Sequence, residues 1–201
     1  MKYLVLALVF AAGYLTAHLT GVTGAADPQP QAPSPPPPAN PNIDFAGHLT
    51  VAQKAEQHRA TRRLSEDDFL KASKEEGVIV LDARSKAMYD LLHIDGAINL
   101  SFPDIDVESL KKVLPDKKAK ILIYCNNNFT PAAGFPKPAD GQQPNPMTVK
   151  VAEAMRPKGI ALSLNISTYT TLFGYGYTNV YELAPLLDPA KTKLALVSSK
   201  K

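Results

Sequence analysis

Residues 78–84 read VIVLDAR, and residues 121–125 read ILIYC. Each is an uninterrupted apolar run, rich in β-branched residues, and each ends in polar or reactive side chains. Runs of this kind are typical of central strands in parallel sheets, which are buried on both faces. The two stretches therefore predict two buried strands.

Shorter elements surround these two strands. Ser65 and the three acids that follow it indicate a helix start, and Gly77 indicates the end of that helix. Elsewhere the pattern predicts strands over 96–102 and 179–183, and helices over 85–92, 105–114 and 167–173. Strands that alternate with short helices predict an α/β domain with a mostly parallel central sheet flanked by helices.

Composition limits the classes of function. The 201 residues are 45% hydrophobic and 20% charged, which suits one globular domain with extra segments. The net charge is +3, and the basic residues are spread along the chain without a basic stripe that alternates with aromatics. We therefore expect no nucleic-acid partner. No metal ligand set and no cofactor motif is predicted.

The N-terminal segment has the pattern of an export signal. Residues 1–26 contain the basic Lys2, a long apolar run and a small-residue end at Ala25 and Ala26. This pattern predicts a signal peptide or an uncleaved signal anchor. Both interpretations place the remaining chain in the periplasm or outside the cell, with the membrane contacted only through an uncleaved N-terminal segment.

Composition then divides the rest of the chain. Residues 27–42, DPQPQAPSPPPPANPN, predict an extended Pro-rich linker. The remaining segments are expected as an N-terminal helical extension at 43–63, a folded domain at 64–190 and a C-terminal tail at 191–201.

Cys125 is the only cysteine of the chain. A single thiol in an exported protein cannot form an intrachain disulfide, so it indicates reactivity or an intermolecular bond. In open parallel sheets, sites lie at the carboxyl ends of strands. Cys125 follows a predicted strand at such an end, so we interpret it as a candidate nucleophile.

Three segments together resemble one known family. VIVLDARSKAMYDLLHIDGAINLSF (78–102), ILIYC (121–125) and TLFGYGYTNVYEL (171–183) are similar, in this order and spacing, to the rhodanese-like (sulfurtransferase) domain. The resemblance covers about residues 64–188. It implies a three-layer α/β fold and a cysteine, here Cys125, that takes sulfane sulfur as a persulfide and passes it to a thiophilic acceptor. A small sulfur-containing donor or acceptor is the implied partner.

The segment after Cys125 departs from the family pattern. The family has a short loop there, commonly with Gly and Arg, whereas this chain has three asparagines and an insertion at about 129–160. Arg156 and Lys158 are candidates for returning positive charge to the site. The residues expected to bind substrate are Asn126, Asn127, Asn128 and Phe129, and those expected to support the site are Asp82, Arg84 and Asn165.

Three interpretations of this altered loop remain open. The asparagines, which tolerate left-handed conformations, form a cradle of amides around Cys125 with the insertion as a lid. Alternatively, the insertion binds a partner protein while the thiol is incidental. In the third interpretation, the loop has degenerated and the domain is a catalytically inactive module.

Overall fold

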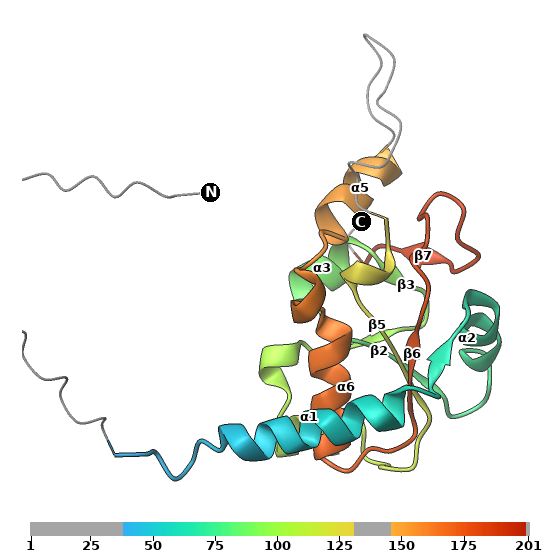
Figure 1. Cartoon of the computed structure of the whole chain (residues 1–201). Coiled ribbons are helices and arrows are strands. Elements are labelled where there is room, and N and C mark those ends of the chain that lie inside the picture. Colours follow the sequence, from blue (N-terminus) through green and yellow to red (C-terminus); the bar gives the residue numbers. More distant parts are fainter. Residues whose placement is uncertain (1–37, 131–145, 200–201) are drawn as a thin grey trace, which may run out of the picture. The chain divides into compact units, whose positions relative to one another are not determined.

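The computed structural model describes residues 38–130 and 146–199, and its described residues from Pro41 onward form one compact unit (Figure 1). The predicted signal segment, most of the Pro-rich linker and the first part of the insertion lie outside the described residues. Among the described helices, none is long and apolar enough to cross a membrane.

A five-stranded sheet forms the centre of this unit. Its strands, in spatial order, are β1 (Arg63–Leu64), β6 (Val180–Leu183), β5 (Ile121–Tyr124), β2 (Ile79–Asp82) and β4 (Ile98–Asn99). Every pairing within this sheet is parallel. The predicted parallel central sheet is confirmed, and the strand that leads to Cys125 lies in its middle.

Helices cover both faces of the sheet. The bounds on one face are α1 (Phe45–Arg59), α4 (Val107–Val113) and α6 (Leu164–Gly174), and on the other face α2 (Glu66–Ala72), α3 (Lys86–Leu91) and α5 (Pro146–Ala154). Alternation along β5 produces this arrangement, because Ile121 and Ile123 pack with α6 while Leu122 and Tyr124 pack with α2 and α5. The three layers match the expected fold class.

The insertion contributes to the core of the domain. Val151 and Ala154 of α5, together with Met155 that follows it, are buried in the same cluster as Tyr124. The helix α5 at Pro146–Ala154 lies within the insertion. The second half of the insertion is therefore an integral layer of the domain.

A small second sheet includes the C-terminal residues. β3 (His93–Ile94) pairs antiparallel with β7 (Leu196–Val197). Leu194 is buried in the core beside these strands. Residues 191–199, which the sequence predicts as part of a tail, thus pack against the domain.

The helix boundaries that differ from the sequence prediction include the end of α2 and the start of α6. Ser65 caps α2 as expected by accepting a hydrogen bond from Asp68 N (3.1 Å), but α2 ends at Ala72, before Gly77. α6 begins at Leu164, earlier than the predicted residue 167. Ser163 stands at the N-cap position of α6 but makes no side-chain hydrogen bond to its own helix.

Candidate active site

Cys125 lies at the carboxyl end of the central strand. It follows β5 directly, between the ends of β2 and β6, and its side chain is a free thiol. The residue is only 1% exposed. The topology therefore places the thiol where parallel sheets hold their sites, but beneath other atoms.

The N-terminus of α6 covers the thiol. Ser163 Oγ lies 3.4 Å from Cys125 Sγ, and Ser163 is the residue that caps α6. The positive end of a helix dipole and its free N–H groups favour an anion placed there. The arrangement can therefore stabilise a thiolate or a persulfide anion. Sequence reasoning missed Ser163, although a serine directly before a helix is a recognised N-cap signal.

The three asparagines after Cys125 form one turn of 3-10 helix, Asn126–Asn128. None of them has a positive φ, since within the described residues only glycines do. The left-handed cradle expected from the sequence is therefore not formed.

Asn128 is a buried structural residue. Its Oδ1 accepts hydrogen bonds from Cys125 N (2.9 Å) and from Asn165 Nδ2 (3.0 Å). Its Nδ2 donates to Leu183 O (2.7 Å) at the end of β6. One carboxamide thus joins the turn, α6 and β6. Asn165 takes part in the site through this contact.

The other two asparagines hold the end of the insertion. Asn126 Nδ2 donates to Arg156 O. Asn127 makes two bonds of 2.9 Å with Lys158, donating to its carbonyl and accepting from its N–H. The side-chain amides of Asn126 and Asn127 therefore fix the main chain of residues 156–158 next to the turn.

Phe129 lies in the core. It is fully buried, meets the ring of Tyr124 edge-on at 6.3 Å between ring centres, and its backbone forms a bridge with Leu187. The structure places it away from the cleft described below. Of the four residues expected to bind substrate, Asn126 alone lines that cleft.

Asp82 and Arg84 form a buried ion pair at the end of β2. Arg84 Nη2 lies 2.6 Å from Asp82 Oδ2, and Arg84 Nε lies 3.0 Å from Asp82 Oδ1. The side chains are 0% and 2% exposed, respectively. Burial by itself lowers the pKa of Arg84, but hydrogen bonds to Asp82 and its charge outweigh this and raise it. Arg84 is therefore positively charged, and Asp82 balances this charge. The role of the pair is structural.

Arg84 also connects distant parts of the domain. Its Nη1 donates to Ala154 O (2.9 Å) at the end of α5, and its Nη2 donates to Leu92 O (2.7 Å). The guanidinium thereby satisfies the last carbonyl of the insertion helix and the carbonyl of Leu92, the C-cap residue of α3. Sequence reasoning did not identify this link, because Ala154 is far from Arg84 along the chain.

Tyr124 completes the network. Its hydroxyl donates to Asp82 Oδ2 (2.5 Å) and accepts from Ile94 N (3.1 Å). Burial, and after it the charge of Asp82, hold the pKa of Tyr124 well above its usual value near 10. Tyr124 is therefore neutral and acts as a hydrogen-bonding strut between β5, β2 and β3.

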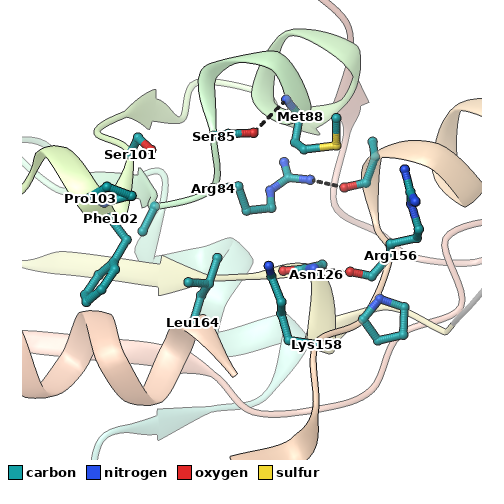
Figure 2. Close-up of a pocket in the computed structure, with 13 residues that line it drawn as sticks. Arg84, Ser85, Met88, Ser101, Phe102, Pro103, Asn126, Arg156, Lys158 and Leu164 are labelled. Carbon is teal, nitrogen blue, oxygen red and sulfur yellow. Dashed lines mark hydrogen bonds between the residues drawn. The ribbon is translucent and has the colours of Figure 1, made fainter. Parts of the chain in front are cut away.

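A cleft of about 460 Å³ opens beside the thiol (Figure 2). Asn126 and Leu164, which directly follow Cys125 and Ser163, form part of its wall. Arg84, Arg156 and Lys158 also line it, so the structure brings the two candidate cations of the insertion to the site. The cleft thus places basic groups next to the residues that directly follow Cys125 and Ser163.

The fold and site define a class of protein: an α/β domain with one thiol at the carboxyl end of its central parallel strand, against a helix N-terminus. The sequence comparison is more specific, because residues 65–139 match the family model of the rhodanese-like domain. The chain contains a rhodanese-like domain. No protein with a curated description matches the sequence significantly.

The comparison with solved structures finds the BH2092 protein from Bacillus halodurans, at 18% identity over 75% of this chain and 87% of that chain, with a TM-score of 0.46. A rhodanese with anions from E. coli has 20% identity over 60% of this chain and 98% of that one (TM-score 0.34). A thiosulfate sulfurtransferase from Pseudomonas aeruginosa has 15% identity over 77% of this chain, which spans 23% of that one (TM-score 0.43).

Proposed function

We propose that this protein is a sulfur carrier or sulfurtransferase in which Cys125 holds sulfane sulfur as a persulfide. The observation that carries the proposal is the contact of 3.4 Å between Cys125 Sγ and Ser163 Oγ, which lies at the N-terminus of α6. Despite the insertion, the thiol is next to a helix end that stabilises an anion on sulfur. The rhodanese-like match of residues 65–139 supports the same chemistry.

The reaction takes place in two sulfur transfers. The Cys125 thiolate attacks the outer sulfur of a donor such as thiosulfate; a new S–S bond forms, the donor S–S bond breaks, and its electron pair leaves with sulfite. The enzyme then holds Cys–S–S⁻. An acceptor thiolate attacks the terminal sulfur of this persulfide, and the Cys125 sulfur leaves as the thiolate. No net oxidant or reductant is consumed.

Because the thiol is covered, the sulfur-transfer cycle requires a conformational change. At 1% exposure Cys125 cannot meet a donor, so the groups above it must shift before attack. Ser163 and the η4 turn (Ile160–Leu162) lie between the insertion and α6. We place the opening there, because Ile160 and Leu162 are exposed.

The compartment and partners belong to the same proposal. The export-like pattern of residues 1–26 supports a location in the periplasm, outside the cell or at the inner membrane. A small sulfur compound is the donor or acceptor. A partner protein is the alternative occupant of the surface formed by the insertion.

Mass spectrometry of the intact protein tests the function. The full chain is incubated with thiosulfate, or with an organic persulfide, and is then desalted. We expect the mass of one added sulfur on Cys125, its loss after an acceptor thiol is supplied, and no addition to the Cys125→Ser variant. The Ser167→Ala variant, altered elsewhere in α6, serves as a matched control that gains sulfur normally.

One result overturns the proposal: a folded wild-type protein that gains no sulfur from either type of donor. Cooperative thermal unfolding of the same sample establishes that it is folded. The interpretation of the domain as an inactive module that binds a partner through its insertion then replaces the carrier.

A further inference from the structure

Two cations that line the cleft beside Cys125 have side chains that form no ion pair within the described residues. Neither Arg156 nor Lys158 forms an ion pair with any residue in the described part of the chain, and both are exposed. Arg84, by contrast, is neutralised by Asp82. Among the described residues, no acidic side chain lines the cleft. The cleft therefore has a net positive charge from the insertion, available to an anionic ligand.

The cleft also has an apolar side. Met88, Phe102, Pro103 and Leu164 line it, and Figure 2 shows Phe102 and Pro103 on the side away from Arg156. A small inorganic anion has no apolar atoms to pack against such a surface, whereas an organic molecule can bury its carbon chain there.

Its size agrees with this composition. The volume of about 460 Å³ falls in the range that holds organic ligands, which is roughly 300–1,000 Å³. Thiosulfate has only five heavy atoms and would leave most of this space to water. The charge, lining and volume together fit an organic anion bound beside the turn that follows Cys125.

The turn after Cys125 positions the basic wall. Asn126 donates to Arg156 O, and Asn127 bonds both the N–H and the carbonyl of Lys158. These contacts join the residues next to the thiol to the segment that bears the cations. Asn126 and Asn127 are therefore positioning residues for Arg156 and Lys158.

We propose that the cleft binds a small organic persulfide that carries carboxylate groups, and that Arg156 and Lys158 are its specificity-determining residues. The inference rests on the proposed function and names its donor. The Cys125 thiolate attacks the outer sulfur of R–S–S⁻; the new S–S bond forms, the old one breaks, and R–S⁻ leaves with the electron pair. The released thiol keeps its carboxylates in the basic cleft until it dissociates.

Calorimetric titration of the Cys125→Ser full chain tests the binding without the chemistry. The probe is S-methylglutathione, which has two carboxylates and a blocked sulfur. We expect saturable binding that weakens as salt is raised, because the exposed charges are screened. The dimethyl ester of the same probe should bind at least about tenfold more weakly, since it lacks both carboxylates.

Variants assign the binding to the insertion. Arg156→Gln and Lys158→Gln should each weaken probe binding by roughly twofold to fivefold, the range for exposed ion pairs. Lys150→Gln, at an exposed position of α5 outside the cleft, is the matched control and should bind like the parent. Thermal unfolding of each variant establishes that it is folded.

The inference is overturned if the parent shows no saturable binding, if the ester binds as tightly as the acid, or if Arg156→Gln and Lys158→Gln bind like Lys150→Gln. These failures differ from failure of the proposed function, because Cys125 of the wild-type chain can still gain sulfur from thiosulfate. The salt dependence of probe binding to the Cys125→Ser protein is a further test that does not require the Arg156 or Lys158 variants.

Discussion

Asn165 donates a hydrogen bond to Asn128 (Nδ2 to Oδ1, 3.0 Å), although 37 residues separate them in the chain. The bond ties the first turn of α6 to the turn that follows Cys125. The same Oδ1 also accepts from Cys125 N. The position of the thiol under the helix end therefore depends on one buried carboxamide.

Replacing Asn128 should strongly destabilise the domain. Asn128→Ala leaves Cys125 N, Asn165 Nδ2 and Leu183 O without their hydrogen-bond partner. A buried polar group that loses its partner costs about 1–3 kcal/mol. We expect a loss of about 3 kcal/mol in the free energy of unfolding, measured by urea titration. Asn127→Ala, in an exposed contact, should cost less than about 1 kcal/mol. Equal losses in the two variants would contradict this role.

The Asp82–Arg84 pair provides a second test of stability. Arg84→Met leaves the carboxylate of Asp82 buried without its countercharge, so the variant should lose about 3–5 kcal/mol of unfolding free energy. Lys86→Met removes an exposed partner of Asp90 and should change stability by less than about 1 kcal/mol. If Arg84→Met is as stable as Lys86→Met in urea, the Asp82–Arg84 pair does not stabilise the domain.

Access to Cys125 should be limited by opening of the structure. We expect iodoacetamide to alkylate the native protein on the order of a hundredfold more slowly than a peptide of residues 121–130, because the thiol is 1% exposed. Ser163→Gly should increase the rate several-fold by removing the cover, and glycine is tolerated at an N-cap. Ser163→Thr keeps the hydroxyl and should remain slow. Identical rates for all three proteins would place the barrier elsewhere.

His58 should make stability depend on pH. Burial, and after it the charge of Arg62, lower the pKa of His58 from its usual 6.5. Protons therefore bind more tightly to the unfolded state, so stability is present above pH 6.5 and is lost as the pH falls through the lower folded-state pKa. Urea midpoints between about pH 8 and pH 5 should fall less steeply in His58→Gln than in the wild type. His48→Gln, at an exposed position, should follow the wild type.

The sequence was sufficient to predict the centre of the fold. β2 and β5 are long apolar runs, and their position in a parallel sheet predicted where Cys125 lies. β1, β3 and β7, each of two residues, were not predicted. Their pairing depends on tertiary contacts.

The partners of the candidate site residues were less accessible to sequence reasoning. The side chains of Asn126, Asn127 and Asn128 bond residues 30, 31 and 55 positions away, respectively. No local pattern specifies such distant carbonyls. Ser163 is a partial exception, because its position before a helix is a local signal, but its contact with Cys125 is equally distant in sequence.

The pairing of early strands with late ones has a consequence for synthesis of the chain. β1 at Arg63–Leu64 pairs with β6 at Val180–Leu183, and β3 pairs with β7 at Leu196–Val197. Closing such long loops costs entropy before any stabilising contact forms. The sheet can be completed only after β6 has left the ribosome, so a nascent chain that ends within the insertion exposes the edge of β5 and depends on protection from aggregation.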